Sequence, residues 1–148
     1  MTTYDLSTGN ASALGLCAEG LGCVYKLEKT IEVQATGVVA SDKLKVFNIP
    51  PYHSVLKVVT EVITAAGTTS TISIGTSGTA TAYDASVNLN AAEGTIAQSD
   101  VAGTDAGIGV VSGTANGIYV THNHAQALAV YRITALVADL SPKSDSLI

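Results

Sequence analysis

Apolar and polar residues alternate along several stretches of the chain, most clearly between residues 24 and 33. Odd positions there are mainly apolar, and charged residues fall on even positions. The apolar set is Tyr25, Leu27, Ile31 and Val33. A period of two places one set on each face of a β-strand, so the stretch predicts a half-buried strand. Only Lys29, which falls within the apolar set, interrupts the pattern.

Similar patterns continue along the rest of the chain. Further strands are predicted at residues 44–49, 54–64, 70–74, 108–112, 117–122 and 127–139, with a short strand or extended segment at 87–89. Pro50 and Pro51 end the first of these, because proline cannot donate to a strand ladder. Short turns predict two hairpins, one joining 54–64 to 70–74 and one joining 108–112 to 117–122. The last strand is apolar on nearly both faces, which is typical of a central strand.

These elements predict an all-β protein, an antiparallel β-sandwich of jelly-roll or Greek-key type. Residues 1–22 have no hydrophobic period and are predicted to form an extended N-terminal arm. The sandwich domain is expected over residues 23–140, and residues 141–148 form a short polar tail. Ordering such an arm requires a surface for it to lie against, on its own body or on a neighbour.

Composition narrows the function classes. The 148 residues are 47% hydrophobic and only 13% charged, with a net charge of −5, which excludes a disordered chain. The longest apolar stretch is interrupted well before the roughly 18–20 residues of a membrane-spanning helix, so no membrane partner is expected. The seven Lys and Arg residues do not cluster, which argues against nucleic acid. The low charge favours a chain that works within an assembly.

The N-terminus has no signal-peptide pattern, so the two cysteines, Cys17 and Cys23, are expected to remain thiols. A disulfide closing the glycine-containing loop between them is the alternative. No cofactor, catalytic residue or metal is expected, because no Gly-x-Ser-x-Gly elbow or phosphate loop is present.

One pair of residues has the spacing of metal ligands. His122 and His124 would face the same side of a strand, and His53 or an aspartate would have to supply a third ligand. The simpler interpretation is two histidines at the surface or at a loop end.

Several residues are candidates for contacts with a partner protein or with another subunit. Arg132 lies in an apolar strand and is expected to pair with a carboxylate, since an unpaired buried charge is costly. Tyrosine is common at protein interfaces, and an ordinary packing role is the alternative for each one here. The other candidates lie in the arm or in loops: Tyr4, Leu6, Leu14, Leu16, Tyr52 and Tyr83.

The segment from Leu44 to Leu56, with its Pro50-Pro51 pair, resembles small structural proteins of tailed bacteriophages. The resemblance extends over about residues 44–139. It includes the strands and Gly-Thr turn of residues 59–76, Tyr83-Asp84, Ala92–Thr95, and the closing strand Tyr131–Val137. Within this group the chain looks most like capsid decoration, or cement, proteins.

The resemblance implies a non-enzymatic virion protein that binds the outer surface of a phage capsid and stabilises contacts between major capsid subunits. The major capsid protein is then its partner, and its location is the capsid surface after assembly in the host cytoplasm. A homo-oligomer is implied, with a trimer favoured over a dimer.

Two alternatives come from other function classes. A receptor- or carbohydrate-binding module of a phage tail or head fibre requires exposed aromatic loops, and the absence of Trp weakens it. A small cupin-like metal enzyme could use His122 and His124, but further ligands are missing at any clear spacing.

Overall fold

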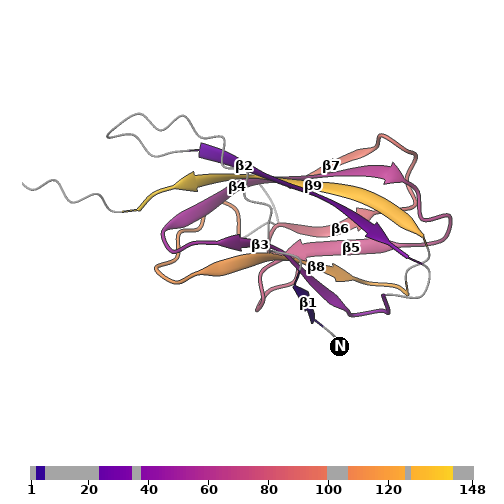
Figure 1. Ribbon diagram of the computed structural model, residues 1–148, viewed down its shortest axis with the longest axis horizontal. Coiled ribbons are helices and arrows are strands. Elements are labelled where there is room, and N and C mark those ends of the chain that lie inside the picture. The colour runs from indigo at the N-terminus through magenta and orange to yellow at the C-terminus, as the bar shows by residue number, and fades with distance from the viewer. Residues whose placement is uncertain (1–2, 6–23, 35–37, 100–106, 126–127, 142–148) are drawn as a thin grey trace, which may run out of the picture.

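The computed structural model describes residues 3–5, 24–34, 38–99, 107–125 and 128–141. The described residues form nine β-strands and no helix. The strands are β1 (Thr3–Asp5), β2 (Val24–Val33), β3 (Lys43–Ile49), β4 (His53–Thr64), β5 (Thr71–Gly75), β6 (Asp84–Asn88), β7 (Ile96–Gln98), β8 (Asn116–His122) and β9 (Ala129–Asp139). They form two facing sheets (Figure 1), which confirms the predicted β-sandwich.

The two sheets share a regular layout. One has five strands in the order β1-β3-β8-β5-β6, and the other has four in the order β2-β9-β4-β7. Every pair of neighbouring strands is antiparallel except β1 and β3, which run parallel. Between β2 and β9 the chain changes sheet at every connection except the one from β5 to β6.

The first and last long strands confirm the sequence prediction. β9 lies between β2 and β4, and alternate residues from Tyr131 to Val137 are fully buried between the sheets. Along β2 the inner row is apolar except for Lys29, which is half-buried. An inward-facing charge on an edge strand discourages pairing with further strands, because that charge would be desolvated more completely.

Both predicted hairpins are wrong. β4 and β5 belong to different sheets, so the turn between them carries the chain across the sandwich. The amide of Ala66 bonds the carbonyl of Leu89, which draws this turn toward the end of β6. Residues 108–112 form no strand, because their backbone is used elsewhere: Gly109 donates to Val55, and Ser112 accepts from Tyr52.

Two short strands were not predicted. β7 lies within the stretch 90–106, which has no hydrophobic period, and its three residues pair with β4. β1 lies within the predicted arm and pairs with the edge of β3. Because the described residues form no helix, they include no helix that could cross a membrane.

Candidate interaction surface

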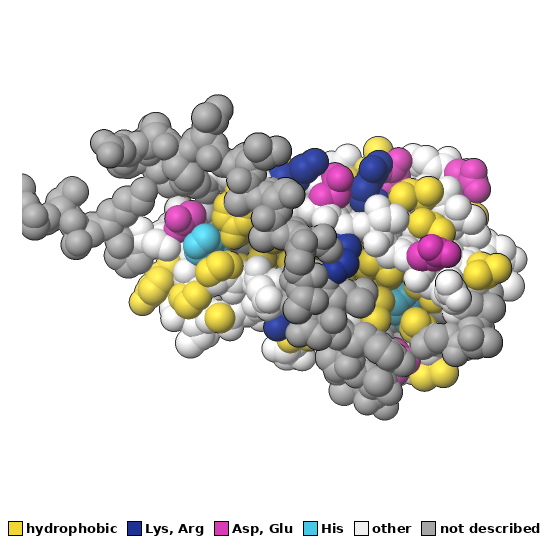
Figure 2. Space-filling view, in the orientation of Figure 1, with side chains coloured by type: hydrophobic (Ala, Val, Ile, Leu, Met, Phe, Trp, Pro, Cys, Tyr) yellow, Lys and Arg dark blue, Asp and Glu magenta, His cyan; other side chains and the backbone are white. Residues whose placement is uncertain are grey.

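Four exposed apolar side chains come together at one end of the sandwich, where β4 begins and β9 ends. They are Tyr52, Val110, Val111 and Leu140, and we call them the Tyr52 patch. Backbone hydrogen bonds hold the three segments side by side. Tyr52 donates to the carbonyl of Ser112 at 2.7 Å, and Leu140 donates to the carbonyl of Tyr52 at 2.9 Å. Figure 2 shows hydrophobic side chains gathered at this end of the molecule (left).

Tyr52 itself adopts a backbone conformation that is unusual for its type. Its φ is +62°, in the left-handed region that a bulky residue rarely occupies. The turn made by Pro50 and Pro51 and the two hydrogen bonds to the Tyr52 backbone fix this conformation. The side chain is held with 43% of its surface exposed, so the candidate tyrosine is available to a partner.

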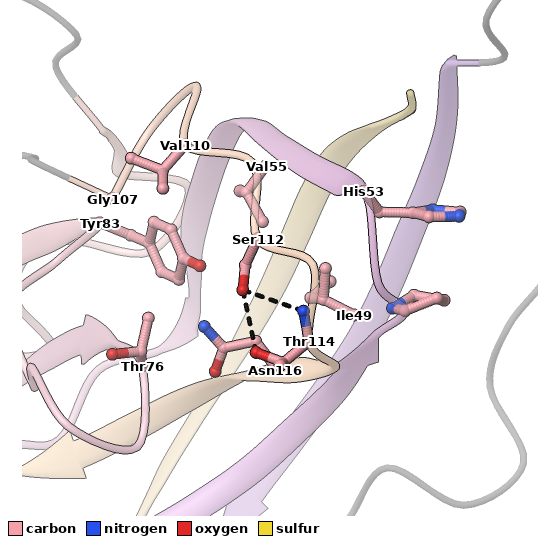
Figure 3. A pocket seen from close by; sticks show the side chains of 11 residues that line it. Ile49, His53, Val55, Thr76, Tyr83, Gly107, Val110, Ser112, Thr114 and Asn116 are labelled. Carbon is pink, nitrogen blue, oxygen red and sulfur yellow. Dashed lines mark hydrogen bonds between the residues drawn. The ribbon is translucent and has the colours of Figure 1, made fainter. Parts of the chain in front are cut away.

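A small pocket of about 60 Å³ lies beside the patch, between the two sheets (Figure 3). Val55 and Val110 form part of its apolar wall, and Tyr83, Ser112 and Asn116 supply polar groups. The hydroxyl of Ser112 lies 3.0 Å from that of Thr114, which orders one rim. A pocket of this size and lining has room for a small apolar side chain or a few water molecules.

Tyr83 takes the packing role rather than that of a surface tyrosine. It is only 4% exposed and belongs to the core that both sheets enclose. Burial raises the pKa of its hydroxyl, which therefore stays protonated at neutral pH and can donate a hydrogen bond. Gly107 lies against it, since a β-carbon there would meet the Tyr83 ring at 2.8 Å. Tyr83 therefore forms part of the pocket wall.

Three polar side chains contact one another in series at the same end of the four-stranded sheet. The Tyr25 hydroxyl lies 2.7 Å from Nδ1 of His53, and Nε2 of His53 lies 3.3 Å from an Asp139 oxygen. These residues belong to β2, β4 and β9, so the chain of contacts joins three neighbouring strands. Burial and the nearby Asp139 charge both raise the pKa of Tyr25. A hydroxyl that holds its proton this firmly is a poor nucleophile, so the cluster is suited to fixing the strand ends.

The two candidate metal ligands occupy different environments. His122 is completely buried, with Nε2 3.1 Å from the Tyr131 hydroxyl. Burial lowers its pKa to about 4, although nearby Asp42 acts in the opposite direction. His124 is exposed in the turn that follows β8, where its ring meets Thr71. The expectation that both lie at the surface is therefore wrong for His122, and the two rings do not face one site because β8 ends between them.

His53 lies in the Tyr25–His53–Asp139 cluster rather than beside these histidines. Among the described residues, no group of three or more His, Cys, Asp or Glu side chains could hold a metal ion.

Arg132 forms an ion pair with Glu61 on the outer face of the four-stranded sheet, which confirms that it pairs with a carboxylate. The two residues are direct register partners, and Nε of Arg132 lies 3.1 Å from the Glu61 carboxylate. Both side chains are about one-third exposed. On the neighbouring strand, a hydrogen bond from Lys26 lowers the pKa of Glu28. This face is therefore charged, in contrast to the Tyr52 patch.

The candidate interface residues of the predicted arm lie in β1 or outside the described residues. Tyr4 lies in β1, at the register position of Leu44. Leu6, Leu14, Leu16 and both cysteines lie outside the described residues. Sequence reasoning did not single out Val110, Val111 or Leu140. Val110 and Val111 lie in a loop and Leu140 follows the end of β9, and backbone contacts distant in sequence bring these segments together at Tyr52.

A second, larger hollow of about 270 Å³ opens on the neighbouring surface of the five-stranded sheet. The Tyr119 ring and Lys45 lie side by side there as register partners, over Gly117. Asn48 and Asn116 also line it. An aromatic ring beside amide groups is an arrangement that can bind an uncharged polar ligand.

Comparison with known proteins finds similarity in fold. No family model and no curated protein sequence matches the chain. Among solved structures, it is similar to a chain of the cyanophage Pam1 capsid asymmetric unit, with a TM-score of 0.63 and 22% identity over 88% of this chain and 96% of that one. The chain has the fold of a phage capsid component.

Two further structures support the same conclusion. A chain from the capsid of Ralstonia phage GP4 matches with a TM-score of 0.57 and 14% identity, covering 86% of this chain and 88% of that one. A chain from the acidic stable capsid structure of Helicobacter pylori bacteriophage KHP30 matches with a TM-score of 0.56 and 14% identity, covering 78% and 89%.

Proposed function

We propose that the chain is a non-enzymatic structural protein of a bacteriophage virion. The observation that carries this proposal is the shared fold, which spans nearly the whole length of the matching chains from three phage capsid structures. The resemblance of residues 44–139 to phage structural proteins points the same way. The described residues also contain a surface suited to protein contacts.

Within that role, the proposed activity is to bind the outer surface of the capsid and stabilise contacts between major capsid subunits. The Tyr52 patch supplies exposed apolar area, and apolar area removed from water contributes about 25 cal/mol per Å² before the cost of association. The predicted arm, residues 1–22, adds contacts through Leu6, Leu14 and Leu16. The proposed partner is the major capsid protein, and the proposed state is a homo-oligomer, with a trimer favoured over a dimer.

The finer fold assignment belongs to the same proposal. The eight strands β2–β9 would form a jelly roll, an architecture found in viral capsid domains. Its support is the distribution of strands, four in each sheet, with the chain changing sheet at nearly every connection.

A binding experiment with capsids tests the proposal. Purified protein is added to phage capsids assembled without it, and co-sedimentation and capsid melting temperature are measured. The expected result is saturable binding that raises the melting temperature of the shell. Absence of binding, or binding without any gain in capsid stability, would contradict the cement role.

Matched variants test the surface. Val111→Asp places a charge in the Tyr52 patch, whereas Ile96→Asp places one on the exposed part of β7. If the patch contacts the capsid, Val111→Asp weakens binding and Ile96→Asp does not. Equal effects of both variants would argue against this surface.

The hollow beside Tyr119 favours a second candidate function, carbohydrate binding by a tail or head-fibre module. An aromatic ring and amide side chains can contact the two kinds of surface on a sugar. Screening the intact protein on a glycan array, with Tyr119→Ala as the comparison, tests it. Specific binding lost in the variant supports this function, and no binding on the array rejects it.

A further inference from the structure

β1 is attached to the sandwich differently from every other described strand. It stands at the end of the five-stranded sheet and has β3 as its sole strand neighbour there. Its three residues pair in parallel with β3, with Thr3 beside Lys43 and Asp5 beside Lys45. All other described pairs are antiparallel. β1 is thus a short strand added to an existing edge.

Among the residues whose burial the structure describes, β2–β9 and their connections enclose a hydrophobic core. The buried hydrophobic side chains run from Leu27 to Ala138 and come from β2–β9 and their connections. What β1 provides is backbone hydrogen bonding for one segment of the β3 edge, Lys43–Lys45. Because these are backbone hydrogen bonds, the same segment of another copy can form them with this edge equally well.

The length of the connection allows β1 to reach beyond its own body. Eighteen residues separate Asp5 from Val24, the first residue of β2. A chain of that length spans up to about 60 Å when extended. A folded domain of this size has a radius of gyration of only about 15 Å. The same edge on an adjacent copy is therefore within reach.

Charge favours the segment for this slot. Asp5 is the only charged residue among the first 18, and no Lys or Arg precedes Lys26. The slot itself is basic, because Lys43 and Lys45 flank its middle residue. The register places the acidic Asp5 at the position beside the basic Lys45.

We propose that β1 is exchanged between copies of this protein, so that Thr3–Asp5 of one copy adds in parallel to Lys43–Lys45 of its neighbour. The exchanged strand makes the same hydrogen bonds as it does within one chain, so exchange loses no strand pairing. Copies held close together favour it further by raising the effective concentration of the segment. This inference goes beyond the proposed function and requires no capsid.

Disulfide trapping in solution tests the exchange. Both native cysteines are first replaced by Cys17→Ser and Cys23→Ser, and thermal melting checks that this background folds. One copy then carries Thr3→Cys, and a second copy of different length carries Lys43→Cys. The two are mixed, incubated and oxidised, and non-reducing gels report disulfides between the two variants. Asp5→Cys with Lys45→Cys provides a second register pair.

The matched control replaces Lys43→Cys by Lys57→Cys, which lies on β4 in the other sheet. Exchange predicts roughly tenfold more mixed disulfide for the register pair than for the control, since only register partners meet the distance a disulfide needs. A single chain carrying both Thr3→Cys and Lys43→Cys reports closure within one copy. Closure only within one chain, or no disulfide in either format, overturns the proposal.

Discussion

The hydroxyl of Tyr131 lies 3.1 Å from Nε2 of His122, inside the core between the two sheets. Tyr131 belongs to β9 of the four-stranded sheet and His122 to β8 of the five-stranded sheet. Both side chains are fully buried, so this polar contact joins the two sheets inside the core. The other ring nitrogen of His122, Nδ1, is buried and has no hydrogen-bond partner among the described residues.

This arrangement predicts an acid-sensitive fold. Burial lowers the folded-state pKa of His122 to about 4, whereas the unfolded chain takes up a proton near pH 6.5. Below pH 6.5 the unfolded state therefore binds more protons, and the free energy of unfolding falls as the pH falls toward 4. The full loss is on the order of 3 kcal/mol, set by the gap between the two pKa values. Urea unfolding at pH 7, 5 and 4 measures it.

Two variants separate His122 from the other titrating groups. His122→Gln keeps a polar side chain near Tyr131 but cannot titrate, so its unfolding free energy should fall less steeply between pH 6.5 and 4. His124→Gln removes the exposed histidine and should leave the slope unchanged. An identical slope in His122→Gln and in the unaltered protein would refute the assignment.

The sequence contains a signal for the buried histidine. Ile118, Val120 and His122 stand at every second position of β8, and the first two are completely buried. Alternation therefore places His122 in the inner row, just as it places Lys29 in the inner row of β2. Position in the alternation thus indicates a buried histidine, whereas polar residue type alone indicates one at the surface.

The pairing of strands could not be predicted in the same way. Alternation shows which face of a strand is buried, but it does not show which sheet the strand joins. Residues 54–64 and 70–74 are separated by a short glycine-containing turn, yet β4 pairs with β9 and β5 pairs with β8. Tyr52 and Tyr83 show the same limit at the site. Both lie outside predicted strands, yet Tyr52 is exposed and Tyr83 is buried. The loop that contains Gly107 lies against Tyr83, and the sequence pattern does not predict this contact.

Gly75, the last residue of β5, offers a test of close backbone packing. A β-carbon there would lie 2.1 Å from the Thr79 carbonyl oxygen and 2.5 Å from a backbone atom of Ala80. Backbone atoms cannot move aside cheaply, so Gly75→Ala should lower the free energy of unfolding by about 2–4 kcal/mol. Gly78 in the same loop has no atom within 4 Å of such a carbon, and Gly78→Ala should be nearly neutral. Equal denaturation midpoints for the two variants would contradict this packing.

The Arg132–Glu61 pair is expected to matter little for folding. Both side chains are partly exposed, and exposed ion pairs are screened by water and salt. Arg132→Met should therefore lower the melting temperature less than Gly75→Ala does. Added salt should bring the melting temperature of Arg132→Met still closer to that of the unaltered protein, because salt screens the ion pair. If Arg132 also lies at a subunit or capsid interface, the variant weakens assembly while its melting temperature is nearly unchanged. Glu61→Gln, which removes the partner, is the control for a purely intramolecular role.

Tyr52 and Ser41 are the two described non-glycine residues with positive φ, at +62° and +75°. Glycine adopts this conformation without steric cost, whereas alanine does not. Tyr52→Gly should therefore be more stable than Tyr52→Ala by about 1 kcal/mol, and Ser41→Gly should exceed Ser41→Ala by a similar amount. Chemical denaturation of the four variants measures both differences.

The two positions should then differ in binding. The Ser41 amide donates to the carbonyl of His122, at the opposite end of β3 from Tyr52, and its variants should bind capsids normally. Both Tyr52 variants remove a partly exposed ring from the Tyr52 patch, so both should bind capsids less tightly, whichever of them is more stable. Strained residues persist where the surrounding structure holds them in place, and they are often found at functional sites. Unchanged capsid affinity in Tyr52→Gly would assign the strain to the turn alone and exclude the ring from the interface.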